Sequence, residues 1–386
     1  MRFLSVMKVT FGRTRVSSRL AGLVIARSLS NATLQSERYD FGIAFDIDGV
    51  ILRGRTPIGG SPEALRKLYD DSGSLRIPYL FLTNGGGIPE SRRAQELTRI
   101  LGVDILPLQV VQGHSPFKNL LNRYENELIV TVGKGEPATV MSEYGFRKTL
   151  SIDEYSSCFN DIDPLAPYKH WFTEQPFLKN NRPEVMQTKY NVLSDKVKAA
   201  FVVSDPVDWS RDIQVLCDIL QSGGLPGKGV GDPQPALYFA ADDLEYQAAF
   251  PCERLGMGAF RIALESIYNR IHHPPLKYTS YGKPNPSVFK NAEVILKQLQ
   301  SYILEKQEEE IHELETIYMI GDNPSVDING VQQTGKPWFS ILTRTGVFRE
   351  NGNHAQFPAD LVIDTVEEAV DYILRKESSK IGVTIF

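Results

Sequence analysis

The 386-residue sequence predicts an α/β protein with a doubly wound parallel sheet, into which a second α/β domain is inserted. Apolar runs that read as strands alternate with segments that read as helices. The runs are continuously apolar, as in strands that are buried on both faces. Polar motifs directly follow several of these runs, at the sheet edge where open α/β folds bind ligands.

The first part of the chain carries two strand–helix units. Each apolar run ends at a polar residue or turn motif, and each helix begins with residues that suit a helix start. We expect strands at 41–45 and 77–82 and helices at 61–71 and 91–101, with Ser61 as a helix cap and Pro62 in the first turn.

The same alternation returns near the C-terminus, and a middle segment carries strands and helices of its own. For the C-terminal part we expect a helix at 286–314, strands at 316–320, 338–343 and 361–363, and a final helix at 366–374 capped by Thr365. For the middle segment we expect strands at 128–132, 199–203 and 236–240 and helices at 208–221 and 258–268.

Long loops set the middle segment apart. Residues 180–183 and 223–235 are rich in Pro, Gly and Asn, and loops of such length inside a compact domain are usually functional or inserted. We therefore expect a core domain at 38–114 and 279–386, and an inserted domain at 115–278.

The N-terminal segment, residues 1–37, differs from the rest in charge. It contains six Arg or Lys residues and several serines, and no acidic residue precedes Glu37. This composition is typical of a mitochondrial presequence, which predicts a mitochondrial location, in the matrix rather than another compartment. A disordered basic tail is the alternative; a secretory signal fits less well, because arginines interrupt the apolar stretch.

Composition argues against several other classes of protein. The net charge of −5 and pI near 5.8 do not favour binding to nucleic acid. No apolar run reaches the ~20 residues of a membrane-spanning helix, so we expect no integral membrane segment. The three cysteines, Cys158, Cys217 and Cys252, form no CxxC pair, and we expect buried, reduced thiols.

Four short motifs lie at the ends of expected strands or in loops. Two of them are rich in aspartate: Asp46-Ile-Asp48 follows the first strand, and Asp322 and Asp327 follow the strand at 316–320. Gathered at one sheet edge, these carboxylates form an oxygen-rich site of the kind that Mg²⁺ prefers. Each motif alone is weak, because two nearby aspartates often serve as a turn or a helix cap.

The other two motifs supply groups that bind anions. Thr83 can donate its hydroxyl, and the backbone N–H groups around Asn84 and Gly85 can line an anion site. Lys283, in Gly-Lys-Pro-Asn, adds a positive charge. A lysine, backbone donors and Mg²⁺ together suit the binding of a phosphoryl group.

In this order, the four motifs resemble those of the haloacid dehalogenase (HAD) superfamily, and the resemblance covers essentially everything after residue 38. The large insertion resembles the type-2 cap of nitrophenyl phosphatases and pyridoxal-phosphate phosphatase. Segments 113–117, 204–209 and 254–258 further resemble the cat-eye-syndrome critical region protein family and its fungal mitochondrial relatives. The resemblance implies a Rossmann-like core with a cap domain.

The resemblance also implies a role for each matching residue. Asp46 would attack phosphorus and Asp48 would exchange protons with the leaving group and water. Lys283, which also neutralises Asp46, Thr83 and Asn84 would bind phosphate. Asp46, Asp322 and, through its backbone carbonyl, Asp48 would bind Mg²⁺, with Asp327 behind them as a second-shell carboxylate.

The implied activity is Mg²⁺-dependent hydrolysis of a small phosphorylated metabolite. A carboxylate at Asp48 favours phosphoryl transfer over dehalogenation, since a leaving alkoxide needs a proton. A weakly active binding or scaffold protein and a phosphotransferase stay open as alternatives, as does a homodimer formed through the cap. Among cap residues, Glu245 and Arg254 are candidates for substrate contact, although either could be structural.

We predict that the N-terminal segment is removed on import into mitochondria, because its arginines suit an electrically driven passage. The measurement is the N-terminal residue of the protein isolated from cells. A full-length cytosolic product that starts at Met1 would contradict the presequence.

Overall fold

The structure, a computed structural model, describes residues 40–169, 190–192, 194–230, 233–307 and 313–381. The presequence prediction and the loop at 180–183 lie outside these residues. Residues 39–386 form one compact unit, which contains two parallel sheets.

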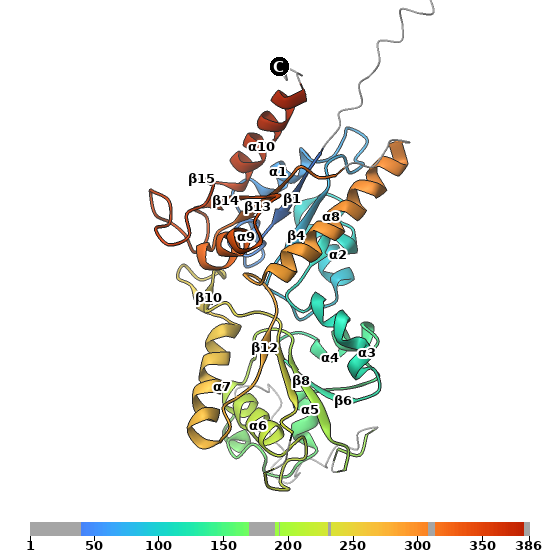
Figure 1. The fold of residues 1–386 in the computed structure, drawn as a ribbon, viewed down its shortest axis with the longest axis vertical. Coiled ribbons are helices and arrows are strands. Elements are labelled where there is room, and N and C mark those ends of the chain that lie inside the picture. Colours follow the sequence, from blue (N-terminus) through green and yellow to red (C-terminus); the bar gives the residue numbers. More distant parts are fainter. Residues whose placement is uncertain (1–39, 170–189, 193, 231–232, 308–312, 382–386) are drawn as a thin grey trace, which may run out of the picture. The chain divides into compact units, whose positions relative to one another are not determined.

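The first sheet has six parallel strands in the order β15-β14-β13-β1-β4-β5 (Figure 1). Its strands are β1 (Phe41–Phe45), β4 (Tyr79–Leu82), β5 (Val110–Val111), β13 (Thr316–Gly321), β14 (Trp338–Thr343) and β15 (Leu361–Ile363). This order confirms the doubly wound α/β fold.

Helices cover both faces of this sheet, which explains its continuously apolar strands. Alternate strand residues enter opposite hydrophobic cores: Phe45 and Phe81 pack on one face, and Ala44 and Leu80 on the other. Residues of α1 (Ser61–Arg66), α2 (Glu90–Leu101) and α10 (Val366–Ile381) belong to the first core. Residues of α8 (Pro286–Gln307) and α9 (Asn329–Thr334) belong to the second.

Strand β1 lies where the winding direction reverses, between β13 and β4. Its last residue, Phe45, pairs with Ile320 of β13 and Phe81 of β4. The residues that follow Phe45, Phe81 and Ile320 therefore lie at the same carboxyl edge of the sheet. A reversal of the winding direction leaves a crevice at this edge in which open α/β folds bind ligands.

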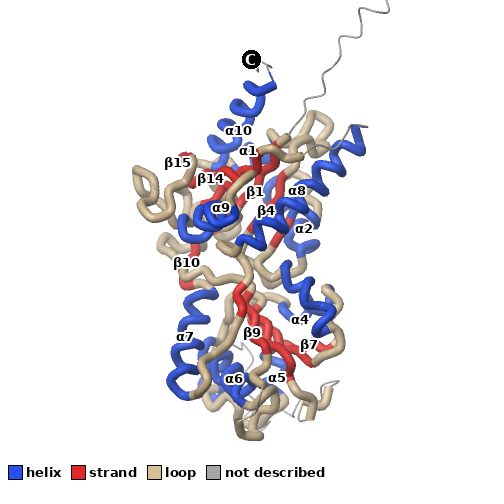
Figure 2. Tube along the Cα trace, viewed as in Figure 1, coloured by secondary structure: helices blue, strands red, loops and turns tan. Residues whose placement is uncertain are grey.

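The second sheet comes from the chain between β5 and α8 (Figure 2). Its five parallel strands have the order β12-β9-β8-β6-β7. The strands are β6 (Leu128–Val132), β7 (Lys148–Ser151), β8 (Val197–Val202), β9 (Ala236–Phe239) and β12 (Thr279–Ser280). The helices are α3 (Leu121–Tyr124), α4 (Pro137–Glu143), α5 (Ile152–Ser157), α6 (Trp209–Gln221) and α7 (Met257–Ile271).

Two short antiparallel hairpins lie outside these sheets. One pairs β2 (Leu52–Arg53) with β3 (Thr56–Pro57), and the other pairs β10 (Glu245–Tyr246) with β11 (Arg254–Leu255). Short 3₁₀ turns at Pro107–Gln109, Ser115–Leu120 and Ala166–Tyr168 and a π-turn at Pro324–Ile328 complete the described elements.

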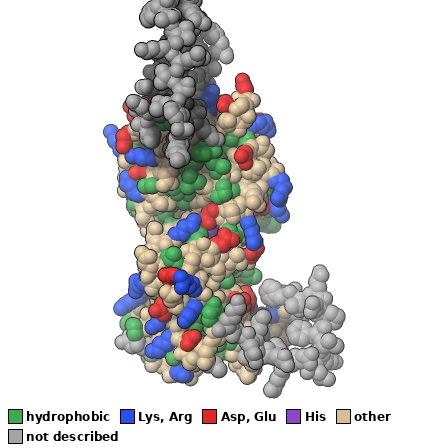
Figure 3. All heavy atoms as spheres, turned by 90° about the vertical axis from the view of Figure 1, so that its right-hand side faces the viewer, with side chains coloured by type: hydrophobic (Ala, Val, Ile, Leu, Met, Phe, Trp, Pro, Cys, Tyr) green, Lys and Arg blue, Asp and Glu red, His purple; other side chains and the backbone are tan. Residues whose placement is uncertain are grey.

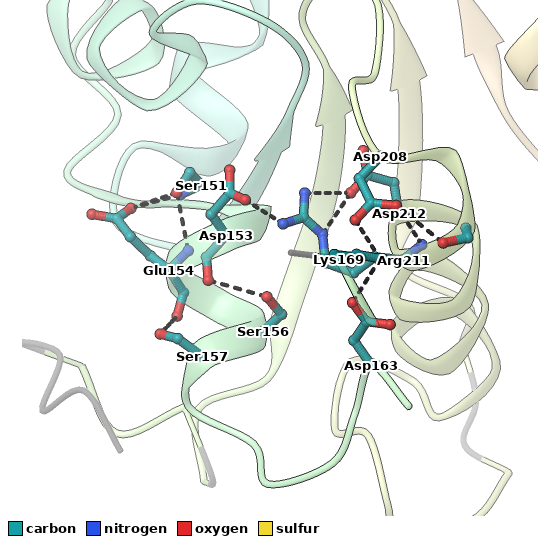
Figure 4. A network of polar contacts seen from close by, with 11 residues as sticks. Ser151, Asp153, Glu154, Ser156, Ser157, Asp163, Lys169, Asp208, Arg211 and Asp212 are labelled. Atoms are coloured by element: carbon teal, nitrogen blue, oxygen red, sulfur yellow. Dashed lines mark hydrogen bonds and ion pairs between the residues drawn. The ribbon is translucent and has the colours of Figure 1, made fainter. Parts of the chain in front are cut away.

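A polar network joins the starts of α5 and α6 in the inserted region (Figure 4). Arg211 bonds Asp212 at 2.7 Å and also contacts Asp153 of α5. Lys169 bonds Asp163 at 2.8 Å and contacts Asp208, the N-cap of α6. Burial raises the pKa of Asp212 to about 6, and Arg211 opposes this shift. The ion pair with Arg211 therefore compensates part of the cost of burying the Asp212 carboxyl.

The structure corrects some local predictions. Ser61 is not the helix cap: Gly60 occupies that position with φ 71°, and the Ser61 hydroxyl donates to the Ile51 carbonyl instead. The helix ends at Arg66, earlier than expected. Cys252 is exposed, although Cys158 and Cys217 are buried. The Thr365 cap is confirmed by its bond from the Glu368 N–H.

The surface carries both signs of charge. On the face in Figure 3, acidic and basic side chains are interspersed, and hydrophobic ones form small groups. Within the part of the chain that the structure describes, no helix combines the length and apolarity that crossing a membrane requires.

Candidate active site

The sheet register gathers the predicted site residues around one cleft. Asp46 follows β1, Thr83 follows β4, and Asp322 follows β13. The Asp46 N–H donates to the Ile320 carbonyl at 2.9 Å, which extends the β1–β13 pairing to the carboxyl edge of the sheet. The residues of the set that line this cleft are Asp46, Asp48, Thr83, Asn84, Lys283 and Asp322.

Lys283 is the positive centre of the cleft. Its ammonium lies 2.9 Å from Asp46 Oδ1 and 2.6 Å from Asp327 Oδ1, and its side chain is only 1% exposed. Burial alone would lower the pKa of Lys283, but Asp327 and Asp46 raise it above its ordinary value. Lys283 is therefore a fixed positive charge between two carboxylates.

One lysine does not balance the acids around it. Burial raises the pKa of Asp46 to about 7 in spite of the attraction of Lys283. Burial, together with repulsion from Asp46 and Asp327, raises the pKa of Asp322 well above its ordinary value. Three carboxylates against one ammonium leave a formal charge of −2, which a divalent cation would balance.

The three carboxylates also have the geometry of a metal site. Asp46, Asp322 and Asp327 each offer an oxygen, and these oxygens all lie within 4.8 Å of one another. The oxygens of Asp327 already accept from Lys283 Nζ and, at 3.0 Å, from the Asn323 N–H. Asp46 and Asp322 are therefore the better ligands, and Asp327 fits the supporting position expected from the sequence.

Two glycines make room for the Asp322 carboxylate. A side chain at Gly49 or Gly346 would collide with Asp322 Oδ2, and Gly49 also has φ 93°, which disfavours other residues. The Val347 N–H donates to the same oxygen at 2.7 Å and fixes its orientation.

A tight turn after β1 brings Asp48 back to the cleft. The Ile47 carbonyl accepts bonds from the N–H groups of Ile51 and Leu52, both at 2.9 Å. A side-chain carbon at Gly85 would lie 3.2 Å from both Asp48 Oδ2 and Thr83 Oγ1, so these two polar groups flank one small space. Burial raises the pKa of Asp48, against the opposing effects of Arg93 and Lys134.

The Asn84 side chain positions Lys283. Its Oδ1 accepts from the Lys283 N–H, and its amide donates to the Lys283 carbonyl, each at 2.8 Å. The other amide hydrogen goes to Asp243 at 2.8 Å. With these bonds made, any contact of Asn84 with an anion would come from its backbone.

The inserted region supplies cleft residues that sequence reasoning missed. Asp243, whose pKa burial raises to about 8, faces Asn84. Lys134 bonds Asp205 at 2.7 Å and lies 5.5 Å from the centre of the Tyr246 ring. No motif marks these residues, since they follow strands of the second sheet or lie in its loops. The one feature of the sequence that could have indicated them is position: Lys134 follows β6, Asp205 follows β8 and Asp243 follows β9, as ligand-binding residues of parallel sheets often do.

Of the two cap candidates, only one reaches the cleft. Glu245 lines it. Arg254 instead stacks on the Phe250 ring, 4.5 Å from its centre, and is absent from the cleft walls.

Comparisons of the sequence with known proteins give one consistent family. The profile of haloacid dehalogenase-like hydrolases matches residues 43–147, and a HAD-hydrolase-like profile matches residues 280–369. A mitochondrial hydrolase of Saccharomyces cerevisiae is 32% identical over 89% of this chain and 97% of its own length. A Schizosaccharomyces pombe protein that fuses a cardiolipin synthase to a mitochondrial hydrolase is 31% identical over 90% of this chain and 55% of its own.

Solved structures share the fold at lower identity. A 4-nitrophenylphosphatase of Thermotoga maritima is 20% identical with a TM-score of 0.52, covering 87% of this chain and 98% of its own. A glycerol phosphate phosphatase of Mycobacterium tuberculosis, solved with magnesium, is 16% identical with a TM-score of 0.53, covering 87% and 77%. These likenesses extend over both sheets.

We predict that Asp322→Asn stabilises the metal-free protein, because it removes one of the repelling carboxylates. The gain should grow with pH. Burial and repulsion from Asp46 raise the pKa of Asp322 well above its ordinary 3.8, so the wild type loses stability as the pH rises above that ordinary value, and the variant does not lose this part. The melting temperature in EDTA at pH 4.5 and 7.5 measures this.

The control is Asp71→Asn, which removes an exposed carboxylate outside the cleft and should leave both melting temperatures unchanged. A lower melting temperature for Asp322→Asn than for the wild type at pH 7.5 would contradict the repulsion between the buried acids.

Proposed function

Because the chain belongs to the haloacid dehalogenase-like hydrolase family, we propose that this hydrolase cleaves a small phosphomonoester with Asp46 as its covalent nucleophile. The observation that carries the proposal is the buried Asp46–Lys283–Asp327 arrangement beside Asp322. It places the Asp46 carboxyl beside a fixed cation, and it gathers an excess of acids whose charge a divalent ion would balance.

The Asp46 carboxylate attacks phosphorus, and the bond from phosphorus to the leaving oxygen breaks. This gives an aspartyl-phosphate and a free alcohol. Lys283 favours the charged form of Asp46 and attracts the phosphate oxygens, while the Thr83 hydroxyl donates to the same group. The bonds from Asn84 keep Lys283 in place during this step.

Asp48 acts as the proton donor and then as the base. Lys283 bonds Asp46 and Asp327 but not Asp48, so Asp46 is the better candidate for the charged nucleophile and Asp48 for the group that carries a proton. Asp48 gives its proton to the leaving oxygen. It then takes one from the water that attacks the aspartyl-phosphate, which restores Asp46 and releases phosphate.

The proposed metal is Mg²⁺, held by Asp46, Asp322 and the backbone carbonyl of Asp48. Hard carboxylate oxygens in a group of this size suit Mg²⁺. When bound, the ion adds positive charge that orients the phosphate and offsets the charge on its oxygens. Asp327 supports Lys283 from behind.

We further propose that the chain acts in mitochondria, in the matrix. Two observations support this: its basic N-terminal segment and its 32% identical relative, which is a mitochondrial hydrolase. We also propose that the middle of the chain forms a cap domain on the core. Its C-terminal boundary lies after Ser280 and not at residue 278 as expected from the sequence, because β12 (Thr279–Ser280) belongs to the second sheet. The cleft residues from both regions support this division.

We predict that Asp46→Asn lowers turnover of para-nitrophenyl phosphate by at least about 10³-fold, because the amide cannot act as the nucleophile. The change preserves shape, so the melting temperature should hold or rise. Phosphate release measures the effect, and Asp71→Asn is the matched control outside the cleft.

Retention of more than a few per cent of wild-type turnover by Asp46→Asn would contradict the nucleophile. Adding glycerol to the wild-type assay distinguishes hydrolysis from phosphotransfer: a hydrolase releases phosphate in step with nitrophenol, whereas a phosphotransferase yields glycerol phosphate.

We predict that Mg²⁺ stabilises the protein and supports turnover, whereas Ca²⁺ stabilises it without supporting turnover. An ion at about 100 times its Kd stabilises by about 2.7 kcal/mol. Ca²⁺ takes more oxygen ligands at longer distances and would misalign Asp46. Melting temperature and phosphate release at matched saturation measure both effects.

Asp322→Ala is the companion variant and should lose the Mg²⁺ effect in both assays. Equal turnover with Ca²⁺, or no stabilisation of the wild type by Mg²⁺, would rule out the proposed metal site.

A further inference from the structure

A second cavity of about 370 Å³ adjoins the cleft beside Asp48. It shares Asp48, Thr83 and Gly85 with the cleft, together with Lys134 and Tyr246 of the inserted region. Its other walls come from the β2–β3 hairpin, from α2, and from the glycine-rich loop after β4. It therefore opens directly onto the group proposed to protonate the leaving oxygen.

The second cavity is larger than the cleft, and this difference limits where the leaving group of a substrate can lie. The cleft around Asp46 has a volume of about 50 Å³, much less than the about 370 Å³ of the second cavity. The second cavity is within the usual range for small-molecule sites, roughly 300–1,000 Å³. A leaving group attached to a phosphate in the cleft has room on the Asp48 side.

The walls of this cavity carry three cationic side chains, Arg55, Arg93 and Lys134. Arg93 bonds Glu96 at 2.7 Å, and Lys134 bonds Asp205 at 2.7 Å. Neither acid lines this cavity, although Asp205 lines the cleft beside it. A guanidinium has five N–H donors, and this bond to Glu96 engages one of them, which leaves donors for a ligand.

Arg93 is the best placed of the three. Its side chain is 19% exposed, whereas that of Arg55 is 83% exposed and lies 3.4 Å from Glu96. A partly buried arginine held by one carboxylate is preorganised, so it loses little side-chain entropy when a second anion binds. Arg55 adds positive charge at the exposed side of the cavity.

Few groups in the cavity oppose an anion. Asp48 is the one carboxylate among the described lining residues, and it is uncharged when it holds the proton for the leaving oxygen. The larger apolar surfaces are those of Ile88, Tyr246 and Ala248. A side-chain carbon at Gly54 would lie 2.9 Å from Ala249 Cβ, so the β2–β3 hairpin closely approaches the segment after β10 there.

We propose that this cavity binds the leaving group of the substrate, and that this leaving group carries a second anionic group, a carboxylate or a phosphate, recognised by Arg93 and Lys134. The inference rests on the proposed function. It narrows the substrate class to phosphomonoesters with a negative charge a few bonds away from the scissile phosphate.

The first test compares two-carbon phosphate esters that differ only in the second group. These are phosphoglycolate (carboxylate), ethylene glycol bisphosphate (phosphate), 2-hydroxyethyl phosphate (neutral) and phosphoethanolamine (cation). We expect kcat/KM for at least one anionic ester to exceed that for the neutral ester about tenfold or more, and the cationic ester to be poorest. The better anion identifies the second group.

Equal or better kcat/KM for the neutral ester would overturn the inference while leaving the proposed function intact. Absence of hydrolysis of every ester and of para-nitrophenyl phosphate would instead overturn the proposed function. In that case, calorimetry on the Mg²⁺-loaded Asp46→Asn variant still tests the inference, because phosphoglycolate should bind about tenfold more tightly than 2-hydroxyethyl phosphate.

The second test assigns the preference to Arg93. Arg93→Gln should reduce the ratio of anionic to neutral kcat/KM by about tenfold, and Arg93→Lys should retain most of it. Raising the salt concentration should lower the wild-type ratio, because ions screen the attraction. Arg99→Gln, an exposed arginine on the same helix outside the cavity, is the control and should keep the wild-type ratio.

The ratio is taken within each variant, so a general loss of activity does not mimic the effect. An unchanged ratio in Arg93→Gln, measured on protein that melts like the wild type, would overturn the role of Arg93. If that variant does not fold, the wild-type ester series and its salt dependence still decide the inference.

Discussion

The cleft depends on a buried ammonium held between carboxylates. Lys283 lies within 3 Å of both Asp46 and Asp327, and without it three acids would share a space largely removed from water. Burying such charges is costly unless they are paired and hydrogen-bonded. Three carboxylates still outnumber the one ammonium, and the proposed divalent cation would balance this excess.

That constraint accounts for the parts around it. Asn84 uses both ends of its amide on the Lys283 backbone, so the strand that carries Thr83 also fixes the lysine. Gly49 and Gly346 leave space for the Asp322 carboxylate. Asp48, outside the reach of the lysine in the described contacts, is free to carry a proton. In the proposed mechanism, the aspartate that Lys283 contacts in the cleft is the nucleophile, and the one that it does not contact transfers the proton.

The second cavity, beside the cleft, is lined by cations and not by a group of carboxylates. Cations on α2 and after β6 are each held by an acid outside the cavity, so the cavity presents positive charge to whatever is joined to the phosphate. If the proposals hold, residues at the edge of the core sheet carry out the phosphate chemistry, and side chains of the β2–β3 hairpin, α2 and the second sheet's loops select the leaving group.

The sequence by itself determined the α/β class, most strand positions and the identity of the polar motifs, because buried parallel strands and the residues after them are local patterns. It could not place the start of α1: Gly60, not Ser61, is the helix cap because the Ser61 hydroxyl bonds the distant Ile51 carbonyl. Only the tertiary structure could show that the Asn84 side chain serves Lys283, or bring Asp243, Lys134 and Arg93 to the same centre. These contacts join residues far apart in the chain. They are set by the register of strands in two sheets and the packing of the segments between them, which no local pattern encodes.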